Sequence, residues 1–244
     1  LPTPEADRLY SHVVEVNRNV DRLRQVAGNL REAEEGKIRI AATPAFGIDL
    51  LPYAIASYRK EHREITFAVE TLHHDALADA LLESRLDVAL AFDPDNTPGI
   101  EQELLGQGYF VALTPPGMEF EGKSALELKD LAARPFINLD DRGPLGRLLS
   151  THIESSDVGL DTVATAETYQ VAKALVAHGA GVTITDEITA KSSGHDGVRA
   201  WNLMPPLTFR ICAMRSDKTP LPIVCSRFVG HLKVCLERFL DRQI

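Results

Sequence analysis

The chain has 244 residues, 44% hydrophobic and 25% charged, which is ordinary composition for a globular protein. Its net charge of -9 argues against direct nucleic-acid binding, because that needs clustered lysine and arginine to displace counterions. No apolar run is long enough to cross a membrane, and the first residues lack a secretion-signal pattern. The three cysteines form no C-x-x-C pair, so we expect reduced thiols, no metal, no cofactor and a cytoplasmic location.

Residues 1–36 are predicted to form one long helix that pairs with another copy of the chain. Thr3, Pro4 and Glu5 are typical of a helix start. A strict period of 3.5 residues is typical of a seam between helices. A helix that lies on its own domain stays open as the alternative. The apolar residues of the seam, spaced alternately by four and three, are Leu9, Val13, Val16, Val20, Leu23, Ala27 and Leu30.

After Gly36 the pattern changes to alternating strands and helices. We expect strands at residues 38–40, 65–72 and 87–92, with helices at 48–62 and 75–85 between them. This order predicts parallel strands joined by right-handed crossovers.

A second unit with the same alternation follows the turn at residues 115–117. Its predicted helices cover 126–132, 145–154 and 168–178, and its strands cover 136–139, 162–165 and 181–185. One more strand at 208–214 and a long helix at 221–240 complete the chain. Cys225 and Cys235 lie in that last helix, where we expect them to be buried.

Candidate binding residues follow the carboxyl ends of the predicted strands, where ligands bind in open parallel sheets. Small residues there allow a ligand to approach the backbone, hydroxyl and amide groups can donate hydrogen bonds, and Asp186 could pair with a ligand ammonium. Such a set is typical of a site for a small molecule that resembles an amino acid, although each residue alone could simply cap the next helix. The candidates are Thr43, Pro44, Ala45, Phe46, Asn138, Asp140, Thr168 and Asp186.

Residue patterns typical of catalysis are lacking. The sequence contains no H-x-x-x-H or G-x-S-x-G motif, and His73 and His74 are interpreted as surface residues before a helix. The turn at residues 143–147 lacks the lysine of a phosphate loop but could offer backbone N–H groups to a ligand. We therefore predict that the chain is not an enzyme.

Three stretches together resemble the LysR-type transcriptional regulators. They are KIRIAATPAFGIDLLPYAIASYRKEHREITFAVETL, ALADALLESRLDVALAF and VAKALVAHGAGVTITDEITA, and the resemblance covers the whole chain. GVTITDEITA with the later VRAWNLMPPLTFRI resembles the branch of that family that senses amino acids and opines.

The resemblance implies an α/β fold of two Rossmann-like subdomains of periplasmic-binding-protein type, preceded by a long linker helix. Residues 1–36 would be the linker, 37–115 with 209–244 the first subdomain, and 116–208 the second. The effector would bind between the lobes, at residues 43–46 and near Asn138, Thr168 and Asp186. The linker helix would form a dimer or tetramer, and promoter DNA would be bound only through a winged helix-turn-helix domain that is missing from this chain.

We therefore predict the effector-sensing and oligomerising portion of a LysR-type transcription regulator, which binds a small carboxylate such as an amino acid or an opine. Two alternatives stay open at this point. One is a periplasmic solute-binding protein of the same fold, and the other is an enzyme with a cleft between two α/β lobes.

Overall fold

A computed structural model describes residues 3, 9, 10, 12–14, 16, 17, 19, 20, 36–194, 197–218 and 220–242. The described residues between 9 and 20 are helical. Leu9, Val13, Val16 and Val20 expose 64%, 46%, 60% and 38% of their surface, so the described part of the predicted seam is exposed. The remaining seam residues, Leu23, Ala27 and Leu30, lie outside the described residues.

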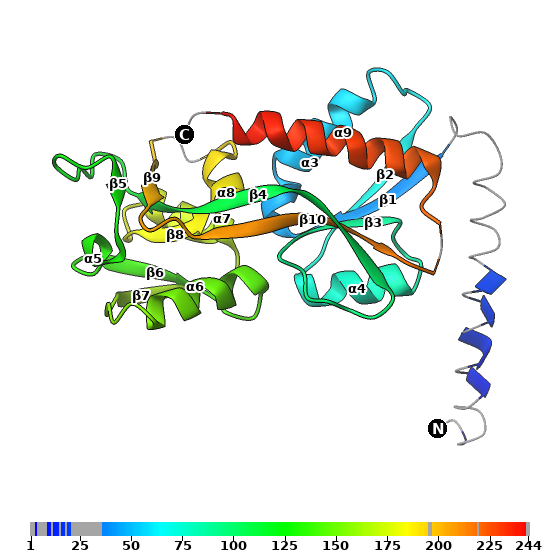
Figure 1. The fold of residues 1–244 in the computed structure, drawn as a ribbon, viewed down its shortest axis with the longest axis horizontal. Coiled ribbons are helices and arrows are strands. Elements are labelled where there is room, and N and C mark those ends of the chain that lie inside the picture. The colour runs from blue at the N-terminus through cyan, green and yellow to red at the C-terminus, as the bar shows by residue number, and fades with distance from the viewer. Residues whose placement is uncertain are drawn as a thin grey trace.

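From residue 36 onward the chain alternates between strands and helices (Figure 1). The strands are β1 (Lys37–Ala42), β2 (Thr66–Thr71), β3 (Val88–Phe92), β4 (Ile100–Thr114), β5 (Ala125–Leu126), β6 (Pro135–Leu139), β7 (Asp161–Ala166), β8 (Thr183–Asp186), β9 (Arg199–Leu203) and β10 (Thr208–Ser216). The helices are α2 (Pro44–Gly47), α3 (Leu50–Tyr58), α4 (His74–Leu82), α5 (Leu128–Leu131), α6 (Pro144–Glu154), α7 (Tyr169–Ala177), α8 (Glu187–Lys191) and α9 (Ile223–Leu240). No described helix has both the length and the apolar content that crossing a membrane requires.

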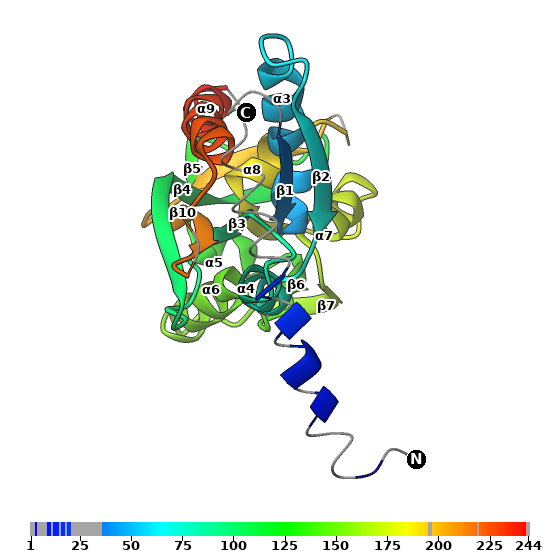
Figure 2. The same cartoon turned by 90° about the vertical axis from the view of Figure 1, so that its right-hand side faces the viewer.

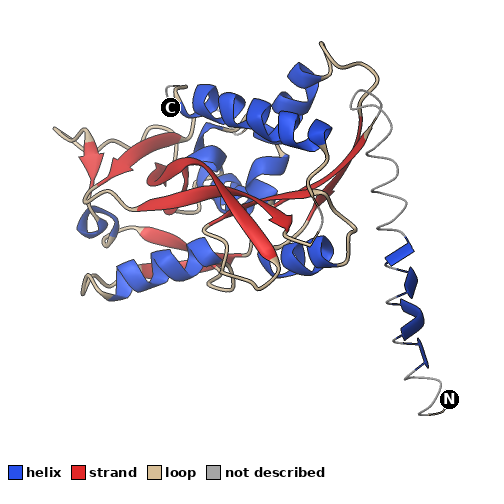
Figure 3. Cartoon of the chain, turned by 45° about the vertical axis from the view of Figure 1, so that its right-hand side comes forward, coloured by secondary structure: helices blue, strands red, loops and turns tan. Residues whose placement is uncertain are grey.

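The strands build two lobes that share one long strand. The main sheet has the order β2-β1-β3-β10-β4-β9-β5, with β8 also paired to β4, and β6 pairs with β7 separately. We call β1–β3, α2–α4 and α9 the first lobe, and β5–β9 with α5–α8 the second lobe. β4 pairs with β10 in its first part and with β8 and β9 in its last part, so it links the two lobes (Figures 1 and 3).

A glycine in β4 lies against an aromatic cluster where β4 pairs with the start of β10. A Cβ on Gly108 would lie 2.3 Å from the ring of Phe209 in β10. That ring is buried and packs edge-on against Phe92 at 5.0 Å and Phe110 at 5.2 Å, so it cannot move aside cheaply. The position of the Phe209 ring therefore requires glycine at position 108.

Helices cover both faces of the sheet in the first lobe (Figure 2). Alternate residues of β1, including Ile38 and Ile40, belong to the main core, to which α3 and α9 contribute. The opposite face carries Ala41, Ala89 and Ala91, which form a smaller core with the leucines of α4. Small side chains on this face of β1 and β3 therefore let α4 approach the sheet closely.

Helix α9 returns to the first lobe and lies on α3. Phe228 of α9 packs against Tyr58 and Phe67, with ring centroids 5.2 and 4.8 Å apart. Cys225 and Cys235 are buried and free, which confirms the prediction for both thiols.

The parallel pairing predicted for the first unit is confirmed, because β1 is parallel to both β2 and β3. In the second unit β8 differs, because it pairs antiparallel with β4. The helix predicted at 48–62 is wrong in extent, since α2 is a separate turn and α3 begins at Leu50. The predicted helix at 126–132 is the short strand β5 followed by α5. The subdomain boundaries near residues 115 and 208 stay a prediction.

A buried ion pair joins β1 to the residue that precedes β3. The Asp87 carboxylate, 2% exposed, accepts hydrogen bonds from the Arg39 backbone N–H at 2.7 Å and from its Nη2 at 2.7 Å. Arg39 Nη1 also donates to the Ser84 carbonyl at 2.7 Å. Because the carboxylate is out of water, removing it leaves a partly buried guanidinium and a backbone N–H without their acceptor.

We expect Asp87→Ala to lower the free energy of unfolding by about 2–3 kcal/mol. Urea denaturation followed by circular dichroism measures the change. Glu119→Ala is the matched control: its pair with Arg199 is exposed on both sides, and its loss should cost less than about 1 kcal/mol. Equal effects of the two variants would contradict the structural role of Asp87.

Candidate functional site

A cavity of about 200 Å³ lies between the two lobes. The first lobe contributes residues 43–45, 73–75 and Phe92, which follow or end β1, β2 and β3. The second lobe contributes residues 140, 142–146 and 167–169, which follow β6 and β7. The carboxyl ends of the parallel strands of both lobes therefore face one another across this space, which has room for a ligand of amino-acid size.

Five of the eight predicted binding residues line this cavity. They are Thr43, Pro44, Ala45, Asp140 and Thr168. These five residues were predicted because they follow strand ends. They come from three separate segments of the sequence and lie at one cavity.

The structure places the other three predicted residues away from the cavity lining. Phe46 is fully buried and packs on Phe92 at 4.3 Å, and Asn138 lies within β6. Asp186 is fully buried, and its carboxylate accepts the Thr189 N–H at 2.8 Å, which caps α8. Burial raises the pKa of Asp186 to about 6. The structure therefore gives Asp186 a capping role, and it does not support pairing with a ligand ammonium.

Several lining residues were missed by the analysis of the sequence. His73 is exposed, as predicted, and His74 is partly buried, and both line the cavity at the start of α4. Arg142 and Glu167 were not considered, although each stands just after a strand end. All four residues lie within three positions after a strand end, so the criterion that predicts Thr43 includes them when it is extended that far.

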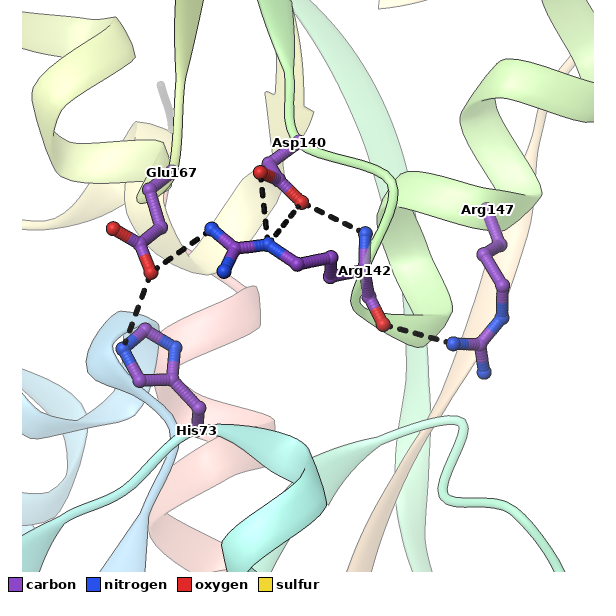
Figure 4. A network of polar contacts seen from close by, with 5 residues as sticks. All are labelled: His73, Asp140, Arg142, Arg147 and Glu167. Atoms are coloured by element: carbon purple, nitrogen blue, oxygen red, sulfur yellow. Dashed lines mark hydrogen bonds and ion pairs between the residues drawn. The ribbon is translucent and has the colours of Figure 1, made fainter.

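Charged side chains form a network across the cavity (Figure 4). The Asp140 carboxylate accepts the backbone N–H of Arg142 at 2.9 Å and its Nε–H at 2.8 Å. Arg142 Nη2 lies 3.2 Å from Glu167 Oε1, and the same oxygen lies 3.8 Å from Nε2 of His73 in the first lobe. An ion pair between the lobes joins Arg147 to Asp95 at 3.0 Å.

The surroundings set the charge of these groups. The hydrogen bonds from Arg142 hold the pKa of Asp140 below its usual value, so the carboxylate is ionised at neutral pH. Burial lowers the pKa of His74, which favours the neutral imidazole.

The wall of the cavity also offers uncharged donors. The Thr43 hydroxyl oxygen is buried and has no hydrogen-bond partner among the described residues. Helices α4, α6 and α7 all begin at the cavity, and no side chain caps the first turn of α6. Free N–H groups and a hydroxyl suit a carboxylate. Within the described ranges, no cluster of three or more His, Cys, Asp or Glu residues is arranged to hold a metal ion.

Two α/β lobes that share a long strand, with a cavity between them whose lining includes charged side chains, are typical of proteins that bind small molecules in an interlobe cleft. The model of the LysR substrate binding domain matches residues 31–235. The chain therefore belongs to the LysR family of transcriptional regulators, as the resemblance implied.

Individual relatives are regulators as well. The chain is 33% identical to the HTH-type transcriptional regulator DgcR of Pseudoalteromonas sp., over 97% of this chain and 81% of that protein. It is 24% identical to the transcriptional activator protein LysR of Escherichia coli, over 98% of this chain and 77% of that protein. These relatives are not enzymes, which confirms the prediction that the chain is not one.

Solved structures share the fold. A LysR family regulator from Pseudomonas aeruginosa, HinK, superposes with a TM-score of 0.74 at 22% identity, over 96% of this chain and 81% of that chain. A full-length OxyR variant from the same species gives a TM-score of 0.75 at 15% identity, over 99% of this chain and 81% of that chain. The predicted fold class, two α/β subdomains of periplasmic-binding-protein type, is confirmed.

The turn that carries Arg142 is packed against the start of α6. A Cβ on Gly146 would lie 2.1 Å from the Asp140 carbonyl oxygen, so Gly146→Ala must displace this turn. We expect the variant to lower the melting temperature. Gly230→Ala is the control, because Gly230 lies exposed in α9 with open space where a Cβ would lie. Alanine there should raise the free energy of unfolding by about 0.5–1 kcal/mol. Differential scanning calorimetry should show shifts of opposite sign; a stabilised Gly146→Ala protein would contradict the packing described here.

Proposed function

We propose that the chain is the effector-sensing and oligomerising portion of a LysR-family transcription regulator that works in the cytoplasm. Its effector is a small carboxylate, such as an amino acid or an opine, that binds between the lobes at Thr43, Pro44, Ala45, Asp140 and Thr168. The observation that carries this proposal is the interlobe cavity, whose wall includes the unpartnered Thr43 hydroxyl. A buried hydroxyl without a partner is costly, and a ligand carboxylate would satisfy it.

Ligand binding would act by a shift between arrangements of the two lobes. The contact between His73 and Glu167 and the ion pair between Asp95 and Arg147 join the two lobes. A ligand that binds one lobe arrangement better than another biases the equilibrium by the difference between its two affinities, and by no more than that difference. The coupling to DNA would follow from the geometry of the oligomer.

The oligomer would form through the seam on the first helix, as a dimer or tetramer. Four described seam residues, Leu9, Val13, Val16 and Val20, are exposed in a helical stretch. Contiguous apolar side chains at this spacing are stabilised when a second helix covers them. Promoter DNA would be bound through a helix-turn-helix domain, because the net charge of -9 makes this chain a poor surface for phosphates.

The effector site is tested first by a thermal-shift screen against amino acids, opines and aromatic acids, in which a ligand at 100 times its Kd adds about 2.7 kcal/mol of stability. For a ligand that binds, Thr43→Val should weaken affinity by about 1–3 kcal/mol, because a donor to the carboxylate is lost. Isothermal titration calorimetry measures the affinity. Thr162→Val, at an exposed position of β7, is the control and should leave the affinity unchanged. Unchanged affinity of Thr43→Val would count against the site.

The seam is tested by adding one charge on it or beside it. Val16→Asp places a carboxylate in the proposed helix–helix contact and should dissociate the oligomer without unfolding the two lobes. Asn17→Asp adds the same charge one position away from the seam and should leave the oligomer intact. Sedimentation velocity reports the mass of each variant, and an undissociated Val16→Asp protein would exclude this seam.

A further inference from the structure

Arg142 and Glu167 form an ion pair in the cavity, and each keeps one side open. Arg142 Nη2 contacts Glu167 Oε1 at 3.2 Å. Among the described residues, no partner is recorded for Arg142 Nη1 or for Glu167 Oε2, and Figure 4 shows both atoms without a dashed line. A guanidinium and a carboxylate that lie side by side in this way present one positive and one negative group to the same space.

The pair is also easy to rearrange. The side chains of Arg142 and Glu167 are 68% and 56% exposed, and exposed ion pairs are weak because water and salt screen them. Asp140 holds the Nε edge of Arg142 with two contacts, at 2.8 and 3.0 Å, and so positions the guanidinium. An incoming ligand can therefore bind the remaining N–H groups of Arg142 without displacing the whole side chain.

We propose that Arg142 and Glu167 select an α-amino acid as the effector, with Arg142 binding its carboxylate and Glu167 its ammonium. This assignment rests on the proposed function of the cavity and names the chemical class of its ligand. An α-amino acid carries both charges on one carbon, so its two charged groups are as close together as the guanidinium and carboxylate that receive them.

The charges of the cavity favour such a zwitterion over a simple anion. Its lining contains three carboxylates, from Asp75, Asp140 and Glu167, against the single guanidinium of Arg142. A ligand with carboxylates alone would pair with Arg142. It would also be repelled by the Glu167 carboxylate, which lies 3.2 Å from the Arg142 guanidinium. A ligand ammonium removes that repulsion and adds a charge-assisted hydrogen bond.

Glu167 also connects the ligand to the arrangement of the lobes. Its Oε1 atom lies 3.8 Å from Nε2 of His73, the start of the segment that leads into α4 of the first lobe. Pairing of the ligand ammonium with Glu167 changes the charge that His73 faces. Recognition of the amine and the contact between lobes therefore use the same carboxylate.

The experiment compares glycine and both enantiomers of the nineteen chiral common amino acids with their amine-free carboxylic acid counterparts, by thermal shift and then calorimetry. For the best amino acid, Glu167→Gln should weaken binding about tenfold or more, because a charge-assisted hydrogen bond is lost. The same variant should change binding of the amine-free counterpart by less than about threefold. Arg142→Gln should weaken both ligands about tenfold or more, because both present a carboxylate.

Asp141→Asn is the matched control for charge. Asp141 precedes Arg142 in the same turn but is exposed and does not line the cavity, so the affinities of this variant should stay within about twofold of the unchanged protein. Melting curves without ligand show whether each variant is folded. Because Arg142 and Glu167 are exposed, both variants should melt close to the unchanged protein.

Two results would overturn the assignment. The first is equal weakening of amino acids and amine-free acids by Glu167→Gln, and the second is binding of amine-free compounds only. In either case, weakening by Thr43→Val would show that the cavity still binds its ligand, so the proposed function would stand while the amino-acid assignment falls. If Thr43→Val leaves every affinity unchanged, both fall.

Discussion

The structure depends on one continuous strand, β4, whose hydrogen bonds are shared between the lobes. Its first part pairs with β10 and its last part with β8 and β9. Both lobes contain strands that pair with β4, and the residues that follow β1, β2, β6 and β7 line one cavity between the lobes. Gly108 leaves room for the ring of Phe209 beside β4, and Phe92 and Phe110 hold that ring in place.

The cavity joins two kinds of chemistry that have different structural origins. Helix starts and the Thr43 hydroxyl are fixed by the backbone, because the strands end there and α2, α4, α6 and α7 begin. The charged network of Arg142, Glu167 and His73 is carried by long, exposed side chains. The first set gives any small carboxylate a place to bind, and the second set supplies the means to tell one carboxylate from another.

Much of the first lobe could be predicted from the sequence because its strands are apolar and its helices have clear periodicity. β4 could not, since its first part alternates charged and half-buried residues and contains two glycines. The strand-end rule found Thr43 and Thr168 but also selected Asp186, which points into the protein and caps α8. Which side of a strand end a residue faces depends on tertiary packing, and periodicity alone does not report it. Arg142 stands three residues after β6 and Glu167 one residue after β7, so their positions alone do not distinguish them from ordinary charged loop residues.

The alanine face of the first lobe has an evolutionary consequence. Ala41, Ala89 and Ala91 let α4 pack tightly, so the frame of that lobe depends on small, buried residues that tolerate little change. The side chains of Arg142 and Glu167, by contrast, stand outside both hydrophobic cores. Substitutions there cost the fold little. A duplicated gene could therefore acquire a new chemical input through a few exchanges at the turns, while inheriting its architecture unaltered.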